Sequence, residues 1–246
     1  MILTIDVGNT STGIAVFNND KIIFKNKLLT PEEVDNSYLN NLISKDFDFR
    51  NIIISSVVPF VNKSLESSLK QRYKIPPVFI NHKTQTGLKI KIKNPEELGE
   101  DRIANSCGAL HFFKPPLLVI DSGTATTFDV VNKDFEYIGG VIYPGIEISI
   151  QSLANNTAKL DKIKFDIPDS PIGKDTVESI RAGIYYTYIG GIRYLIDEYK
   201  KILGNNTKVV LTGGLIKFFK NKIHNINLCE PDLIYYGLNS ILKKLK

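Results

Sequence analysis

The chain has 246 residues, of which 43% are hydrophobic and 23% charged, and its formal net charge is +5. This length and composition predict one large or two small globular domains with hydrophobic cores. The basic residues are spread along the chain without an aromatic-lined basic patch, which argues against a nucleic-acid partner.

The two cysteines and the N-terminus give further exclusions. Cys107 and Cys229 lie far apart and the three histidines are scattered, so we expect neither a zinc site nor a disulfide framework. No run reaches the ~18 apolar residues of a membrane span, and the first residues lack the features of a secretory signal. We therefore expect a cytoplasmic protein that does not bind membranes.

The first half of the chain begins with three short strands. Residues 2–7, 13–17 and 21–24 are apolar runs separated by turn-forming residues, which predicts a meander. Thr30-Pro31-Glu32-Glu33 predicts a helix start, with Thr30 as the cap and Glu33 completing a capping box. A strand at residues 52–54 and a helix over about residues 61–72 follow.

The second half repeats this opening. The apolar run 117–120 ends at Asp121, which is followed by Gly123 and a hydroxyl-rich turn and lies 115 residues after Asp6 (121 − 6). A repeat at half the chain length predicts a duplicated domain pair, residues 1–115 and 116–246. Strands and helices mix in both halves, which predicts an α/β fold with a cleft between the halves.

The rest of the second half is largely helical. Helical patterns cover residues 146–159 and 175–203, and Gly204 is suited to end the second helix. A strand at residues 208–211 runs into Thr212-Gly213-Gly214, and Pro231 opens a terminal helix.

The first turn, Asp6-Val7-Gly8-Asn9-Thr10, carries residues suited to phosphate binding. Glycine lets a phosphate approach the backbone donors, and a carboxylate at a strand end can hold Mg²⁺ directly or through water. The segment is not a Walker A loop, because Ile14-Ala15 stands where that motif has Lys-Ser/Thr. An ordinary hairpin turn would use the same residue types.

The second copy favours phosphate binding over an ordinary turn. Residues 121–127 form a similar hairpin, and two further glycine-rich elements, residues 139–145 and 212–214, follow or interrupt strands. This pattern resembles the superfamily of acetate and sugar kinases, Hsp70 and actin. The resemblance implies two similar actin-like (ribonuclease H-like) domains with a nucleotide cleft between them.

A further motif, Gly99-Glu100-Asp101-Arg102, precedes an amphipathic helical run at residues 103–113. Alone, Asp101 could simply complement a helix dipole. With its neighbours it resembles the Gly-x-Asp-Arg motif of type III pantothenate kinases. Residues 6–13, 121–127, 139–145, 173–176 and 212–214 are also similar to motifs of that family, in the same order and spacing.

The resemblance implies ATP-dependent phosphorylation of pantothenate to 4′-phosphopantothenate, the first step of coenzyme A synthesis. ATP would be bound by Thr124 and by the hairpin residues Asp6, Val7, Gly8, Asn9, Thr10, Ser11, Thr12 and Gly13. Asp6 would lie near Mg²⁺, and Asp121 would hold a monovalent cation, K⁺ or NH₄⁺. Gly99, Glu100, Asp101 and Arg102 would bind pantothenate, with Asp101 as the base. Thr176 would reach pantothenate from the neighbouring subunit of a homodimer.

One position departs from the family. Its members often carry a tyrosine shortly before Asn-Pro, where this chain has Lys91-Ile92-Lys93, so Ile92 stands in place of an aromatic pocket wall. Two alternatives stay open: another kinase or phosphatase of the superfamily acting on a sugar or polyphosphate, and a non-catalytic nucleotide-switched regulatory protein.

Overall fold

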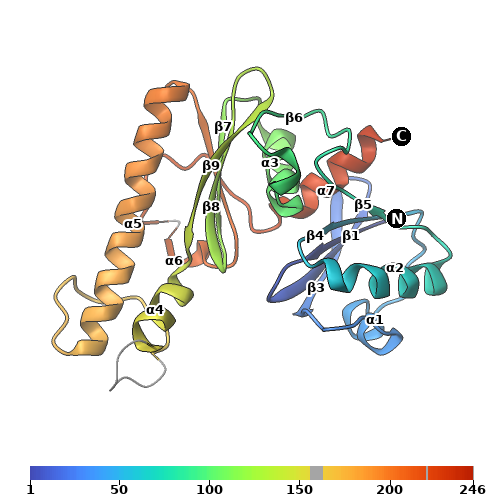
Figure 1. Ribbon diagram of the computed structural model, residues 1–246, viewed down its shortest axis with the longest axis horizontal. Coiled ribbons are helices and arrows are strands. Elements are labelled where there is room, and N and C mark those ends of the chain that lie inside the picture. The colour runs from blue at the N-terminus through green and yellow to red at the C-terminus, as the bar shows by residue number, and fades with distance from the viewer. Residues whose placement is uncertain (156–162, 220, 246) are drawn as a thin grey trace. The chain divides into compact units, whose positions relative to one another are not determined.

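The computed structural model describes residues 1–155, 163–219 and 221–245, which form two compact units (Figure 1). Unit 1 comprises Met1–Phe113, Phe135–Tyr137 and Asp232–Lys246, and unit 2 comprises Lys114–Asp134 and Ile138–Pro231. Across these described ranges, no helix combines the length and the apolar character that crossing a membrane requires.

The first sheet confirms the predicted meander. Its strands are β1 (Ile2–Val7), β2 (Ser11–Asn18), β3 (Lys21–Leu29), β4 (Asn51–Ser56) and β5 (Val78–Phe79), in the order β3-β2-β1-β4-β5. β1 pairs antiparallel with β2 and parallel with β4, so the end of β1 lies at the centre of the sheet.

The second sheet repeats that order. Its strands are β7 (Leu117–Ser122), β8 (Ala125–Val131), β9 (Glu136–Pro144), β10 (Lys208–Thr212) and β11 (Leu228–Cys229). They run β11-β10-β7-β8-β9, and β6 (Lys89–Ile90) joins the β9 edge by pairing with Glu136 and Tyr137. Read from the other edge, the order is β9-β8-β7-β10-β11, which matches β3-β2-β1-β4-β5 of the first sheet strand for strand. The two sheets therefore have the same topology, in agreement with the repeat in the sequence.

Helices cover both faces of the first sheet (Figure 1). On one face, alternate residues of β1 (Leu3, Ile5 and Val7) form a core with α1 (Asn36–Leu42) and α2 (Pro59–Tyr73). On the other face, Ile2, Ala15 and Phe17 pack against Tyr235 of α7 (Leu233–Lys244). Asp6 is in phase with Ile2, so its side chain lies on the α7 face.

α7 crosses α3 (Glu100–Phe112) at very short range within unit 1. A Cβ on Gly237 would lie 1.8 Å from the Ala104 carbonyl oxygen, and one on Gly108 would lie 2.2 Å from the Leu233 carbonyl oxygen. Only glycine fits at both positions. This crossing holds the last helix in unit 1, whereas the sequence placed residues 116–246 together.

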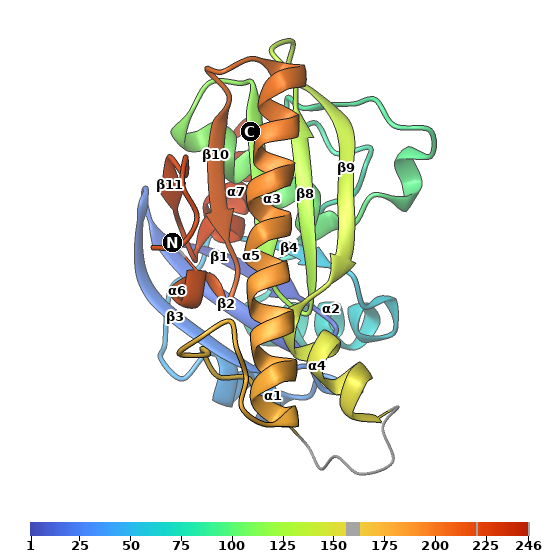
Figure 2. The same cartoon turned by 90° about the vertical axis from the view of Figure 1, so that its left-hand side faces the viewer.

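Unit 2 contains α4 (Ile146–Asn155), α5 (Thr176–Leu203) and α6 (Ile216–Phe219). α5 runs along one face of the second sheet (Figure 2) and buries Tyr185, Tyr188, Ile189, Ile192 and Ile196. Its predicted span and the stop at Gly204, where φ is 100°, are confirmed. The predicted helix at residues 146–159 is present as α4, and its part beyond 155 lies outside the described residues.

The predicted helix start at Thr30 is wrong. Residues 31–35 are irregular, and α1 begins at Asn36 with the Asp35 side chain accepting a hydrogen bond from the Tyr38 N–H at 2.6 Å. The Thr30 hydroxyl is used elsewhere, because it donates to the Gly8 carbonyl oxygen at 2.6 Å.

Candidate active site

The first hairpin joins β1 to β2 and is held in shape by its own backbone and by Thr30. The Gly8 N–H donates to the Ser11 carbonyl oxygen at 3.1 Å. Thr30 Oγ1 lies 3.1 Å from Thr12 Oγ1 in addition to its bond with Gly8, and Asn9 and Thr10 are exposed at the tip. The turn is therefore ordered from both sides, with its tip open to a ligand.

Asp6 lies in a row of residues that crosses three strands. Gly13 is its direct partner on β2 and Ser55 its partner on β4. Ser55 is fully buried, and its Oγ makes no hydrogen bond with any described residue. A carboxylate beside a buried hydroxyl offers the oxygen ligands that Mg²⁺ prefers, so these residues fit that ion.

Tyr235 covers this row from α7. Its hydroxyl oxygen lies 2.2 Å from the place that a Cβ on Gly13 would take. Burial raises the pKa of the Tyr235 phenol, and the negative charges of Asp6 and Asp232 raise it further. Gly13, the last residue of the segment expected to bind phosphate, lies inside β2 and is buried.

The second hairpin, between β7 and β8, is one residue shorter than the first, since Asp121 pairs with Thr127 and Asp6 with Gly13. The Gly123 N–H donates to the Ala125 carbonyl oxygen at 3.1 Å, and the Gly145 N–H donates to the Thr124 carbonyl oxygen at 3.0 Å. Thr124 is exposed at the tip, as the proposed ATP contact requires.

Asp121 lies against the glycine turn that follows β10. Gly213 has φ 98°, and a Cβ there would lie 2.4 Å from Asp121 Oδ1 and 2.5 Å from the Ser122 carbonyl oxygen. Two oxygens therefore converge beside Gly213. The Ser122 hydroxyl is anchored to Tyr188 of α5, with 2.6 Å between the two hydroxyl oxygens.

The motif Gly99 to Arg102 opens α3, with Gly99 as the N-cap residue. Asp101 Oδ1 accepts a hydrogen bond from the Arg102 N–H at 2.8 Å. Burial raises the pKa of the Asp101 carboxyl. The hydrogen bond from the Arg102 N–H and the positive charge of Arg102 lower this pKa, but burial has the larger effect. The pKa of Glu100 is also raised, by burial first and by the Asp101 charge in addition.

Gly99 is needed for this geometry. A Cβ there would lie 2.5 Å from Asp101 Oδ1 and 3.6 Å from a Val57 methyl carbon. The Val57 N–H in turn donates to the Val7 carbonyl oxygen at 3.0 Å. Through Val57, the structure brings the motif at residues 99–102 beside the first hairpin, and both belong to unit 1.

Tyr137 is a candidate site residue that the sequence reasoning missed. The Arg102 guanidinium lies over its ring, 5.8 Å from the centroid, and the ring is fully buried. The Lys91 N–H donates to the Tyr137 carbonyl oxygen at 2.8 Å, next to half-buried Ile92. Its position two residues before Gly139-Gly140 is the one signal in the sequence that could have drawn attention to it.

Thr176 is the exposed first residue of α5 in unit 2. Asp175 caps the helix by accepting from the Glu178 N–H at 2.8 Å, and Glu178 Oε2 accepts from the Lys174 N–H at 2.8 Å. A Cβ on Gly173 would lie 2.3 Å from the Ser179 backbone nitrogen. The segment 173–176 is thus a tight helix cap that presents Thr176 to solvent.

Two duplicated sheets, each with a hairpin at the end of its first strand, define an actin-like α/β fold of the type found in sugar kinases. Two solved structures share it. A Campylobacter jejuni protein assigned to a Baf family of transcriptional activators has a TM-score of 0.61 and 23% identity, with 99% of this chain and 98% of that chain covered. A Sinorhizobium meliloti protein assigned as a 2-dehydro-3-deoxygalactonokinase has a TM-score of 0.59 and 14% identity, with 100% and 97% covered.

Sequence comparison identifies the family. The sequence model of the family described as type III pantothenate kinase matches residues 2–198. A type III pantothenate kinase of Agathobacter rectalis is 37% identical over 253 residues, covering 99% of this chain and 97% of the relative. The chain belongs to the type III pantothenate kinase family.

Proposed function

We propose that the protein transfers the γ-phosphoryl group of ATP to the primary hydroxyl of pantothenate, producing 4′-phosphopantothenate for coenzyme A synthesis. The observation that carries this proposal is the position of Val57, which lies beside Gly99 of the motif and donates through its N–H to Val7, where the first hairpin begins. A base and a phosphate-binding turn on one unit are what phosphoryl transfer to an alcohol requires.

In this proposal the first hairpin, Asp6 to Gly13, binds the phosphates together with Thr124. The exposed tip residues Asn9 and Thr10 supply hydrogen-bond donors, and Asp6 holds Mg²⁺ directly or through water. When bound there, Mg²⁺ would neutralise charge on the phosphate oxygens. Asp6 and Ser55 supply the oxygen ligands that this ion needs.

Asp101 accepts the proton of the attacking hydroxyl. Burial raises its pKa, which makes the ionised carboxylate a stronger base than an exposed aspartate. Gly99 and Glu100 complete the pocket, and Arg102 binds the carboxylate or hydroxyls of pantothenate. The Tyr137 ring limits the rotamers of Arg102, and Ile92 lies on the neighbouring segment as an apolar wall.

A monovalent cation, K⁺ or NH₄⁺, binds at Asp121 in this proposal. The convergence of Asp121 Oδ1 and the Ser122 carbonyl oxygen beside Gly213 supports it. Replacing K⁺ with Na⁺ or Li⁺ at constant ionic strength should depress turnover. Equal turnover in all three salts would remove the cation from Asp121.

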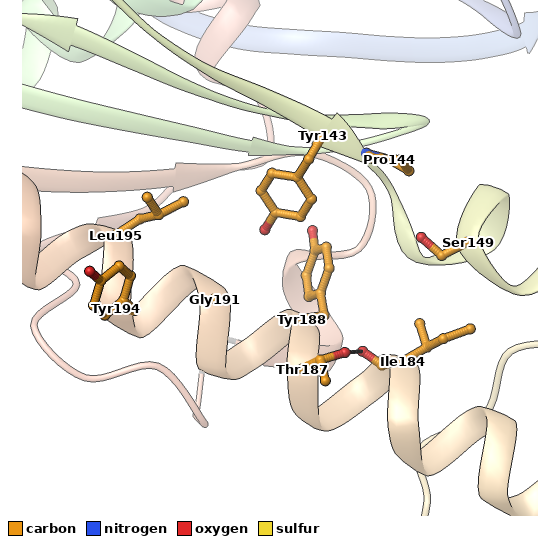
Figure 3. A pocket seen from close by; sticks show the side chains of 9 residues that line it. All are labelled: Tyr143, Pro144, Ser149, Ile184, Thr187, Tyr188, Gly191, Tyr194 and Leu195. Carbon is orange, nitrogen blue, oxygen red and sulfur yellow. Dashed lines mark hydrogen bonds between the residues drawn. The ribbon is translucent and has the colours of Figure 1, made fainter.

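A homodimer is part of this proposal, and the exposed face of α5 supports it. That face carries Gly183, Tyr186, Gly190 and Tyr194 at helical spacing, and Tyr194 is 64% exposed. Beside it, a pocket of about 370 Å³ is lined by Tyr143, Tyr188 and Tyr194 among others (Figure 3). Aromatic and small residues on an exposed helix favour an interface, from which Thr176 would reach the partner's substrate.

A substrate panel tests the proposed function. ADP release should require pantothenate and should not be supported by hexoses, N-acetylhexosamines or polyphosphate. The assay uses the salt and pH of the cytoplasm, where we expect the enzyme to work. Release with a sugar in place of pantothenate would favour another kinase of the superfamily. Nucleotide binding without any acceptor-dependent release would favour the nucleotide-switched regulatory protein.

A further inference from the structure

Tyr235 lies outside every motif that the sequence singled out, yet it reaches the first hairpin. It occupies the first turn of α7, and its ring packs with Ala15 and Phe17 on the α7 face of the first sheet. Its hydroxyl takes the space where a side chain at residue 13 would stand. The glycine at position 13 is therefore required by this hydroxyl.

The hydroxyl also lies next to Asp6. Asp6 and Gly13 are direct partners on antiparallel strands, and such partners have Cβ positions about 4.5–5.5 Å apart on one face. A phenol oxygen 2.2 Å from the Gly13 Cβ position is therefore close to the Asp6 carboxylate. Burial raises the pKa of this phenol, so it carries its proton at neutral pH and can donate it in a hydrogen bond.

A donor at this place would orient a magnesium-binding carboxylate. Carboxylates that receive a metal ion are usually held by a hydrogen bond to one oxygen, and loss of that partner typically weakens the metal about 10–100-fold. Ser55, whose Oγ has no hydrogen bond within the described part of the chain, flanks Asp6 on the opposite strand. Asp6 is thus flanked by hydroxyls from two other elements, Ser55 of β4 and Tyr235 of α7.

We propose that Tyr235 is a positioning residue whose hydroxyl donates a hydrogen bond to the Asp6 carboxylate and holds it in the orientation that receives Mg²⁺. The proposal rests on the proposed function, which places Asp6 at the magnesium ion. It predicts that Tyr235 acts on the magnesium-dependent part of nucleotide binding and on no other part.

The test compares Tyr235→Phe with Tyr236→Phe, which loses a hydroxyl from the adjacent residue of the same helix. Tyr236 stacks on His111, with ring centroids 5.5 Å apart, and meets the ring of Phe17 edge to face at 5.6 Å. ATP affinity is measured by calorimetry with Mg²⁺ and with a chelator. Magnesium should strengthen ATP binding about tenfold less in Tyr235→Phe than in the wild type, and equally in Tyr236→Phe and the wild type. An unchanged magnesium effect in Tyr235→Phe would overturn the proposal.

A second pair of variants tests the geometry without any ligand. Gly13→Ala should lower the melting temperature, because its Cβ meets the Tyr235 hydroxyl at 2.2 Å, whereas the next nearest atom, Tyr235 Cζ, is 3.4 Å away. In the Tyr235→Phe background most of that loss should disappear. An equal loss in both backgrounds would place the hydroxyl elsewhere and contradict the proposal.

Turnover of pantothenate by the wild-type protein separates the two claims. Absent turnover with an intact, Tyr235-dependent magnesium effect would contradict the proposed function and leave Tyr235 in its role. Normal turnover with a magnesium effect independent of Tyr235 would contradict the role of Tyr235 alone.

Discussion

At the scale of single residues, the buried carboxylate of Asp101 is the group on which the chemistry depends. Burial raises its pKa, and the N–H group and the positive charge of Arg102 only partly offset that rise. The same environment makes Asp101 a better base and makes its ionisation costly for the fold. Activity and stability should therefore respond in opposite senses when its charge is removed.

Asp101→Asn should lower kcat by about 10²–10⁴-fold, the usual contribution of a general base, and leave the ATP Kd nearly unchanged. Because Asn keeps the Oδ1 acceptor for the Arg102 N–H, the helix start should survive. Glu96→Gln, an exposed carboxylate five residues earlier, is the matched control. Turnover of Asp101→Asn at the wild-type rate would remove Asp101 as the base.

The pH dependence has a defined sign. The folded pKa of Asp101 is raised above the unfolded value near ~3.9, so the folded protein binds this proton more readily than the unfolded chain. Below the unfolded pKa this carboxyl therefore does not change the free energy of unfolding. As the pH rises through the folded pKa, its ionisation lowers the free energy of unfolding. At pH 7, Asp101→Asn should unfold at an equal or higher denaturant concentration, while wild-type kcat should fall as acid protonates Asp101.

At the scale of elements, the crossing of α3 and α7 holds the substrate motif in place. Asp101 and Arg102 occupy the first turn of α3, and the close approach at Gly108 and Gly237 fixes that helix against α7. A displacement at the crossing should therefore reach the site residues at the helix start.

Gly237→Ala should destabilise the protein by about 1–3 kcal/mol, because its Cβ would lie 1.8 Å from the Ala104 carbonyl oxygen and both backbones would have to move. KM for pantothenate should rise as well. Gly214→Ala is the control, since a Cβ there meets no atom within 4 Å. Equal thermal unfolding of the two variants would contradict the close crossing.

The sequence predicted the elements whose signals are local. The meander, α2, α5 with its Gly204 stop and the half-length repeat all follow from periodicity and turn residues. The two-residue strands β5, β6 and β11 were missed because they carry no pattern of their own. The capping box at Thr30 failed because a tertiary hydrogen bond to Gly8 competes for the same hydroxyl.

For the candidate site, the sequence predicted which segments lie at the ends of the strands, and the binding roles of their residues stay predictions. Glycine and carboxylate motifs identified the hairpins and the start of α3, because close backbone approach leaves a trace in the sequence. Tyr235 left no trace in the sequence, and Tyr137 left only its place before Gly139-Gly140, since their neighbours Gly13 and Arg102 are distant along the chain. Position 13 requires glycine because α7 packs on the first sheet there, and the sequence alone does not show that packing.

At the scale of the whole molecule, the proposed dimer depends on the exposed glycines of α5. A Cβ on Gly190 meets nothing within 4 Å, so Gly190→Ala should gain up to about 1 kcal/mol in helix propensity within one chain. If a partner helix packs there, the added methyl group should weaken the dimer roughly tenfold. Sedimentation equilibrium measures both proteins, and a monomeric wild type or an unchanged dimer constant would contradict this interface.

The most direct measurement of the central claim is the stoichiometry of phosphoryl transfer by the purified protein with ATP, Mg²⁺ and K⁺. We expect ADP to form only when pantothenate is present, with one 4′-phosphopantothenate appearing for each ADP, and both to be lost in Asp101→Asn. ADP formation that does not depend on pantothenate, or no phosphorylated pantothenate alongside it, would contradict the account.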